Sequence, residues 1–225
     1  VVPGMWLGGA ISYTDGNNDF ANGDGDSETY AFTGYGSWLA DNGMFVDVTG
    51  KVGRLKNSFD ISTTLGTASG SYNTNAFSLS AEAGWRLHPL DNSLYVEPQV
   101  EMMYGRVLDA DYTTSMGVAV EHEAVDTLIG RVGFVLGLKC PNNRGNTYVR
   151  ASILHDWQGD AESTFTKGGQ TKRISEELGD TWLEYGVGAN FNATKNLHLY
   201  ADLEATEGAK VETSYRFNLG ARWSF

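Results

Sequence analysis

The 225-residue sequence has one cysteine, few basic residues and no long apolar run, and each shortage excludes a class of protein. The single Cys140 excludes an intrachain disulfide framework and a cysteine-based zinc site, so we expect an unpaired thiol in a turn beside Pro141. Lys and Arg number 16 against 28 Asp and Glu, giving a formal net charge of −12. A nucleic-acid-binding protein needs a basic face, so we expect no nucleic-acid partner.

The sequence also lacks a targeting segment and an apolar helix. Positions 1–14 carry no Lys or Arg, so no secretory signal stands at the front, and we expect a mature chain or a fragment. The longest uncharged run, 61–81, is rich in Ser, Thr, Asn and Gly and cannot be a lipid-embedded helix. Hydrophobic residues still make up 41% of the chain, which is enough to order a domain.

What the sequence does contain is a repeated alternation of apolar and polar residues, which is typical of β-strands. In 76–87, for example, Phe77, Leu79 and Trp85 share one face with Leu87, while Glu82 lies on the other. No segment has a convincing helical stripe, although 173–178 could form one helical turn. We predict ten strands: Met5–Tyr13, Thr29–Leu39, Met44–Arg54, Ala76–Leu87, Leu94–Met103, Leu128–Leu138, Tyr148–Trp157, Trp182–Asn192, Leu197–Ala205 and Phe217–Phe225.

Strand length, charge and aromatic placement together predict a transmembrane antiparallel up-and-down β-barrel. Roughly ten residues is long for a globular strand but is the length that a tilted strand needs to cross a bilayer. A β-sandwich would also have one polar face, so the aromatic residues decide. They gather near strand ends on the apolar face, as in the interfacial girdles of outer-membrane barrels: Tyr13, Trp38, Trp85, Tyr104, Trp157 and Trp223.

The connections between these strands alternate in length, as they do in outer-membrane barrels with long external loops and short periplasmic turns. We expect long loops at 15–27, 55–74, 108–126 and 158–180. Short turns are expected at 40–43, 88–92 and 193–196, a short-to-medium one at 139–145, and a medium connection at 207–213, so that eight of the nine connections fit the alternation. A soluble β-sandwich has no reason to keep this alternation.

Nine stretches carry a resemblance to a known family. They are WLGGAISYTDGN, YGSWLADNGMFVD, SLSAEAGWRL, LYVEPQVEMMYGRV, DTLIGRVGFVLG, YVRASILHDWQGD, DTWLEYGVGAN, LHLYADLEATEG and the terminal FNLGARWSF. In this order they resemble the C-terminal translocator, or β-domain, of a monomeric type V autotransporter. The resemblance covers essentially the whole chain, 1–225, as one barrel domain. Each motif alone is weak, and jointly they are specific.

The resemblance implies a fold, a location and partners. The family barrel has twelve strands, and this sequence resembles strands 3–12, without the opening strand pair and the lumen helix. It implies a monomer in the bacterial outer membrane, with long loops outside and short turns and the C-terminus in the periplasm. The implied function is to anchor and secrete an N-terminal passenger, with membrane lipid, the barrel assembly machinery and the passenger as partners. It implies no cofactor and no enzymatic activity, since the passenger cleavage junction of some members lies upstream.

Two sets of residues are candidate functional positions. Charged residues on the polar faces of the strands are expected to line the lumen, where they contact the passenger or form a structural salt-bridge ladder: Glu82, Glu97, Glu101, Arg131, Arg150, Glu184, Asp202 and Arg222. The last strand alternates strictly and ends on an aromatic residue. The resemblance implies that this pattern is read by the assembly machinery: Phe217, Leu219, Ala221, Trp223 and Phe225.

Several other readings remain open. A stand-alone porin-like or adhesin-type barrel is the main alternative function. A ten-stranded outer-membrane protease would need His122 with Asp126 and Asp109 with Asp111 at the external rim. The acidic segment 15–28 resembles a calcium loop in composition but lacks Gly at the sixth position. The inward glycines Gly84, Gly133, Gly186, Gly188 and Gly220 are also expected to accommodate neighbouring aromatic rings.

Overall fold

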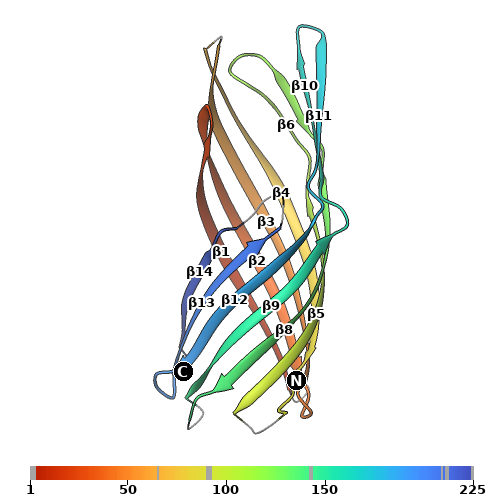
Figure 1. The fold of residues 1–225 in the computed structure, drawn as a ribbon. Helices are drawn as coiled ribbons and strands as arrows, with labels where there is room; N and C mark the ends of the chain where they lie inside the picture. The colour runs from red at the N-terminus through yellow and green to blue at the C-terminus, as the bar shows by residue number, and fades with distance from the viewer. Residues whose placement is uncertain are drawn as a thin grey trace.

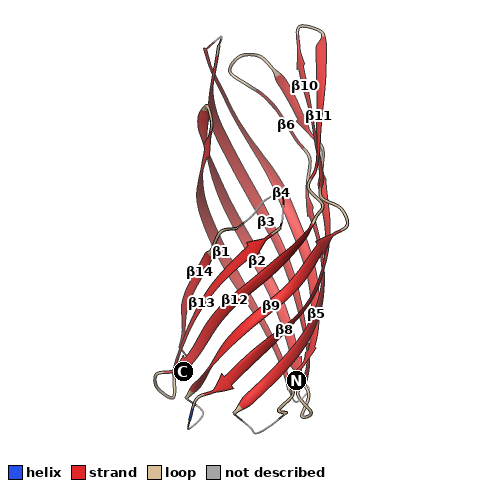
Figure 2. Cartoon of the chain, viewed as in Figure 1, coloured by secondary structure: helices blue, strands red, loops and turns tan. Residues whose placement is uncertain are grey.

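The computed structural model describes residues 4–64, 66–89, 93–141, 144–208, 210 and 213–223. β-strands dominate this part of the chain (Figure 2). No helix among these residues has the length and apolar character needed to cross a membrane.

The main sheet is antiparallel throughout, as the sequence predicted. In the described residues it has ten strands in the order β1-β2-β3-β4-β5-β8-β9-β12-β13-β14. Neighbours in the sheet follow one another along the chain, apart from the segments inserted after β5 and β9. The strand bounds are β1 Met5–Phe20, β2 Gly23–Leu39, β3 Met44–Thr63, β4 Gly66–Trp85, β5 Leu94–Val107, β8 Val125–Lys139, β9 Gly145–Asp156, β12 Thr181–Asn192, β13 Leu197–Glu207 and β14 Arg216–Trp223.

The main sheet is strongly curled, and its strands are tilted (Figure 1). Within the described residues β1 and β14 form the two edges and do not pair with each other, so the sheet is an open part of a barrel. Because an even number of antiparallel strands returns the chain to its starting side, both chain ends lie at the end of the molecule that carries the short turns (Figure 1).

Strands β1 to β4 are much longer than predicted. The segments 15–27 and 55–74, expected as long loops, are instead the ends of two hairpins whose ladders continue to Phe20↔Gly23 and Thr63↔Gly66. Each of β3 and β4 has 20 residues, or roughly 66 Å at ~3.3 Å per residue. The alternation fades in most of these extensions because Gly, Ser, Thr, Asn and Asp fill both faces, although Leu55, Phe59 and Ile61 keep a period of two on β3.

The two remaining long connections are also folded. They supply β6 Ala110–Thr113, β7 Ala119–His122, β10 Asp160–Lys167 and β11 Gln170–Glu177, which form a second sheet in the order β11-β10-β7-β6. This sheet stands beyond the main one, at the same end as the long hairpins (Figure 1). The helical turn predicted for 173–178 is therefore wrong: Arg173 to Glu177 pair with β10 in an antiparallel ladder.

The short turns use the chemistry that their residues suggest. In the turn 40–43 the backbone N–H of Ala40 donates to the Met44 carbonyl at 2.8 Å, and the Met44 N–H donates to the Asn42 side chain at 3.0 Å. Gly43 has φ +87°, a conformation that other residues rarely adopt. The turn therefore fixes the register of β2 on β3.

The burial pattern is inverted relative to a water-soluble protein. Leu136 is 40% exposed, whereas its neighbour Val135 is 9% exposed. The most exposed large side chains include Ile11 at 89% and Leu7 at 72%, while charged Glu97 is 5% exposed. Apolar side chains thus cover the convex face, and the polar ones lie on the concave face, as the predicted period-two pattern requires.

Candidate functional site

The convex face carries an apolar band of constant height. On β3 it runs from Met44 to Val52, and on β4 from Trp85 to Phe77, all exposed. Aromatic side chains lie at both limits of the band, with Trp38 and Trp85 towards the short turns and Tyr13 paired with Tyr30 at the other limit, their ring centroids 4.9 Å apart. The band is about nine residues high on these strands, the length expected for a tilted bilayer-spanning strand.

The concave face carries a charge network at mid-height. Arg131 on β8 bridges Glu82 and Glu101, with N–O distances of 2.8 Å to each carboxylate. The three residues are adjacent across β4, β5 and β8, because Glu82 is opposite Glu101 and Glu101 is opposite Arg131. One guanidinium therefore offsets two carboxylates that directly face each other, an arrangement that would otherwise be repulsive.

A second network lies on the other side of the concave face. Glu204 on β13 is 9% exposed and pairs with Arg150 on β9 and, at 3.8 Å, with Arg216 on β14. Tyr148 donates a hydrogen bond to Asp202. The first network connects β4, β5 and β8, and the second connects β9, β13 and β14.

Glu97 belongs to a third pair nearer to the short turns. Arg86 Nε donates to Glu97 Oε2 at 2.5 Å, and Gln99 donates to Glu97 Oε1 at 2.8 Å. The Arg86 guanidinium also lies over the Tyr95 ring, 4.7 Å from its centroid. Two cavities lie between these groups. Glu184 lines the larger cavity, of 730 Å³, and the smaller one, of 230 Å³, lies nearer to the short turns.

The strand register places on the concave face all eight residues that the sequence analysis expected in the lumen. Seven have the contacts or cavity positions just described. Arg222 is opposite His198 at the short-turn end and is exposed. Sequence reasoning missed Arg86, Glu204 and Arg216. Glu204 and Arg216 lie on the same alternation as Asp202 and Arg222, so the period itself would have found them.

Aromatic rings lie over inward-facing glycines, as expected. A Cβ atom placed on Gly137 would collide with the Tyr95 ring, and one on Gly188 would collide with the Tyr148 ring. Tyr200 covers Gly220 in the same way. Gly84 also accommodates a ring, that of Phe45, but at Gly133 and Gly186 the expectation is wrong, because a Cβ there would meet Ser152 and Glu204 instead of a ring. Where a ring does lie over a glycine, the missing side chain allows its close approach to the neighbouring strand.

An aromatic cluster lies between the long hairpins and the second sheet. The Tyr112 ring stacks on Tyr72 with centroids 5.1 Å apart, and His122 contacts both rings. Burial raises the pKa of Tyr112 to about 12 and lowers the pKa of His122, although Asp111 opposes the latter effect. An apolar cavity of 560 Å³ adjoins the cluster and includes Phe59 among its lining residues.

The rim residues do not form the protease constellation. His122 Nδ1 is 2.7 Å from Ser163 Oγ on β10. Asp126 instead accepts a hydrogen bond from Tyr104 at 2.6 Å and pairs with Arg106 at 3.0 Å. His122 and Asp126 therefore have different hydrogen-bond partners.

The acidic segment 15–28 is part of the β1–β2 hairpin rather than a loop. Its register places Asp15 opposite Glu28 and Asp19 opposite Asp24. In the part of the chain that the structure describes, no group of three His, Cys, Asp or Glu residues could hold a metal ion. Cys140 is partly exposed and free.

The last strand alternates as predicted over its described part. Phe217, Leu219 and Trp223 are exposed on the convex face, at 61%, 72% and 62%, and Ala221 shares that face. Phe225 lies outside the described residues.

A curled antiparallel sheet with an apolar convex band, aromatic girdles and a charged concave face defines a transmembrane β-barrel of the outer-membrane class. The family model for the autotransporter beta-domain matches residues 1–204. The chain therefore belongs to the autotransporter beta-domain family, which makes it an integral outer-membrane protein segment.

Relatives and solved structures agree with this assignment. The pertactin autotransporter of Bordetella parapertussis is 31% identical over 231 residues, covering 100% of this chain and 24% of that protein. The probable autotransporter YcgV of Escherichia coli K12 is 28% identical, with 100% and 24% coverage. The chain thus spans about a quarter of the length of these curated relatives.

Among solved structures, the β domain of the Bordetella autotransporter BrkA superposes with a TM-score of 0.72 and 26% identity, covering 98% of this chain and 84% of that chain. The translocator domain of NalP from Neisseria meningitidis superposes with a TM-score of 0.80 and 16% identity, covering 99% and 76%. The NalP likeness concerns the fold alone.

Proposed function

We propose that residues 1–225 form part of a single barrel domain that anchors an autotransporter in the outer membrane and provides the route by which its N-terminal passenger reaches the cell surface. The observation that carries this proposal is the paired charge on the concave face behind an apolar convex band, in a chain of the autotransporter family. The proposal assigns no catalytic step and no cofactor to this domain.

The lumen lining has two roles in this proposal. Glu82, Glu101, Arg131, Arg150 and Asp202 hold neighbouring strands together, and their partly exposed heads keep the route polar. A polypeptide in transit then meets charges that are already paired, so it passes without a strong single-sign attraction. Glu184, which lines the larger cavity, and Arg222, which lies towards the short turns, extend this lining along the route.

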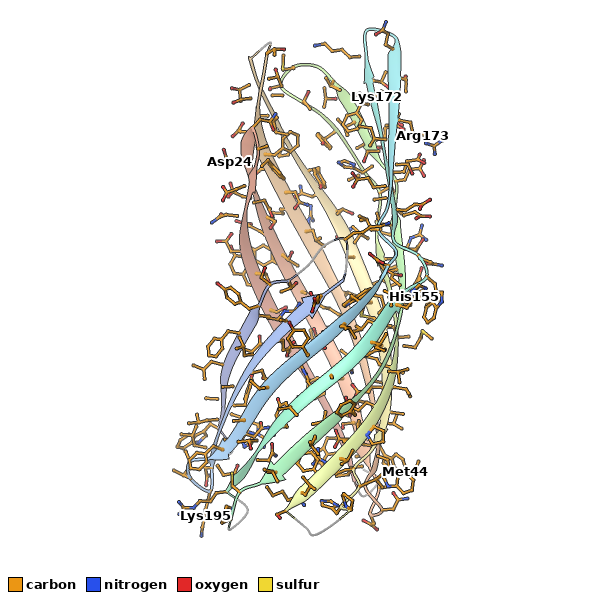
Figure 3. All side chains as sticks on the ribbon, in the orientation of Figure 1. Asp24, Met44, His155, Lys172, Arg173 and Lys195 are labelled. Atoms are coloured by element: carbon orange, nitrogen blue, oxygen red, sulfur yellow. The ribbon has the colours of Figure 1, made fainter. Side chains whose placement is uncertain are left out.

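The proposed orientation places the second sheet and the long hairpins outside the cell and the short turns and C-terminus in the periplasm. Lys172 and Arg173 lie at the outer end in this orientation, and Met44 and Lys195 at the periplasmic end (Figure 3). The difference in length between the two sets of connections supports this choice. The domain acts as a monomer, with membrane lipid against its convex face.

The terminal alternation of Phe217, Leu219, Ala221, Trp223 and Phe225 is proposed as the signal for the barrel assembly machinery. The period-two placement of the first four on the convex face of β14 supports it. Deleting Phe225 should then slow or abolish insertion in cells, while protein refolded in detergent loses only the ~1.5–3 kcal/mol of one buried aromatic. Insertion of the deletion variant at wild-type levels would leave only a packing role.

Site-specific photocrosslinking tests the route. In the full-length protein, a photoreactive residue replaces either inward Asn218, which lines the larger cavity, or its outward neighbour Leu219. A passenger stalled during secretion should crosslink to position 218 and not to position 219, because only the concave face meets the chain in transit.

The neighbouring pair Glu101 and Met102 provides a second inward and outward comparison on β5. Crosslinks of equal yield at inward and outward positions, or passenger crosslinks at 219 alone, would show that the passenger does not pass along the concave face.

A further inference from the structure

The distribution of basic residues on the strands points to a second interaction. The ten main-sheet strands, as described, carry nine Lys and Arg residues: Lys51, Arg54, Lys56, Arg106, Arg131, Lys139, Arg150, Arg216 and Arg222. The register turns six of them towards the concave face. The other three, Arg54, Lys56 and Arg106, face the membrane side, and we call them the outer basic patch.

The register establishes this orientation. Asp47 on β3 is opposite Glu82, a concave-face residue, and side chains alternate along a strand. Arg54 and Lys56 are an odd number of positions from Asp47 and so face outward. Arg106 is an odd number of positions from Glu101 on β5 and also faces outward.

The three side chains lie near the outer limit of the exposed apolar band, with Lys56 two residues beyond Arg54 on β3. Arg54 is directly opposite Tyr30, and Arg106 is directly opposite Phe77, so both stand where the exposed apolar band ends. Asn75, exposed on the intervening β4, is opposite Arg54. At this height a bilayer changes from hydrocarbon to headgroups, and Tyr30 and Tyr104 supply the aromatic girdle.

Two of the three basic side chains of the outer basic patch form ion pairs with carboxylates. Lys56 binds Glu28 at 3.3 Å and also lies 5.1 Å from the Tyr30 ring centroid. Arg106 binds Asp126 at 3.0 Å. Arg54 has no side-chain ion pair among the described residues, and an amide side chain rather than a carboxylate faces it from β4. A guanidinium at a headgroup boundary is well suited to bidentate contact with a phosphate.

From these positions we propose that the outer basic patch binds the phosphate group of an outer-leaflet lipid headgroup. Arg54 makes the principal contact, and Lys56 and Arg106, each already paired with a carboxylate, flank it. The patch lies on the convex face beside the exposed apolar band, so acyl chains packed on that band would hold a lipid phosphate against Arg54. A lipid is therefore the ligand, rather than a free phosphate. The inference goes beyond passenger secretion and rests on the proposed orientation, which places this end of the main sheet at the outer leaflet.

Lipid titration of the delipidated full-length protein in mild detergent tests this proposal. The probe is a bisphosphorylated glucosamine lipid, and native mass spectrometry counts the bound molecules. Arg54→Gln should weaken binding about fivefold, as expected for one basic side chain at an anionic lipid surface, and Arg54→Lys should retain most of it. Lys172→Gln, which removes a charge from the outer hairpin, is the matched control and should bind as the wild type does.

Two further arms identify the source of the phosphate. The same lipid without its phosphates should bind the wild type and Arg54→Gln equally, and inorganic phosphate at equal concentration should not displace the lipid. Equal weakening by Arg54→Gln and Lys172→Gln, or equal affinity for both lipids, would overturn the proposal. A heat-dependent gel shift confirms that each variant is folded, and Arg106→Gln gives an independent variant should Arg54→Gln fail to fold.

Discussion

At the residue scale, the direction of a side chain is decided by one position of register. Leu203 on β13 faces outward and is 47% exposed, while the neighbouring Asp202 faces inward and accepts a hydrogen bond from Tyr148. Shifting the strand by one residue would exchange the two environments. The alternation in the sequence carried this information, which explains why the residues of the concave face could be predicted by number.

Arginine substitution measures these two environments directly. Leu203→Arg should cost ~2–4 kcal/mol of folding free energy, because a charge at the centre of the lipid-facing band is poorly solvated. Asn218→Arg, inward beside the larger cavity and opposite Asp202, should cost less than ~1 kcal/mol. Denaturant titration of full-length protein refolded into lipid vesicles gives both values, and the reverse order would mean that the register is displaced by one residue.

Removing one charge from an ion pair should cost more folding free energy where the pair is buried than where it is exposed. Glu204→Gln leaves Arg150 and Arg216 without their shared carboxylate, and Glu204 is 9% exposed. The expected loss is ~1–3 kcal/mol, since the remaining guanidinium groups lose a charged hydrogen-bond partner. Glu123→Gln breaks a pair with Arg173 in which both side chains are about 60% exposed, and it should cost less than ~1 kcal/mol. Equal losses in the same vesicle assay would mean that the concave face is as well solvated as the outer hairpin.

At the element scale, close contact between neighbouring strands depends on glycine in one strand beneath an aromatic ring of the next. Gly137→Ala should destabilise the domain by ~1–3 kcal/mol, because the new methyl group collides with the Tyr95 ring. Gly34→Ala on β2 is the control, since nothing lies within 4 Å of its added Cβ. The control should be neutral or slightly stabilising. Similar losses in both variants would show that chain stiffness, and not the ring contact, determines the effect.

The second sheet should respond to acid through His122. Burial lowers the pKa of this imidazole below its ordinary value of 6.5, so the unfolded chain binds a proton more readily than the folded one. The sheet is therefore at full stability above pH 6.5 and loses stability as the pH falls through the lowered pKa. Protection factors of the β7 and β10 amides, from hydrogen exchange at pH 7 and pH 5, measure the change, and His122→Gln should abolish the difference in protection between the two conditions.

The sequence predicted the strands of the main sheet but not their extensions or the second sheet. The ten membrane-spanning strands were predictable because lipid on one face and polar groups on the other impose an alternation. Beyond the bilayer that constraint disappears, so the extensions of β1 to β4 and the strands β6, β7, β10 and β11 were expected as loops. The ladder Asp15↔Glu28 to Phe20↔Gly23 is held by backbone hydrogen bonds that leave no hydrophobic pattern. Long-range pairs such as Arg150 with Glu204 likewise depend on strand order, which composition does not encode.

At the scale of the whole molecule, the two edges of the main sheet are the decisive feature. Among the described residues β1 and β14 each have a neighbour on one side only. Within a bilayer every unpaired backbone N–H and C=O costs several kcal/mol, so these edges must be paired in the membrane, either with each other or with further strands of the full-length protein. A closed ladder of this kind resists detergent, because no edge remains at which unfolding can begin.

Closure therefore predicts heat-modifiable migration. Full-length protein refolded in detergent should run at a different apparent mass on a denaturing gel before and after boiling, because only the boiled sample is unfolded. Truncated protein lacking β13 and β14 is the control and should run identically in both states, since it cannot close. Identical mobility of the boiled and unboiled full-length protein would contradict a closed barrel, and with it the assignment of the concave face as an enclosed route across the membrane.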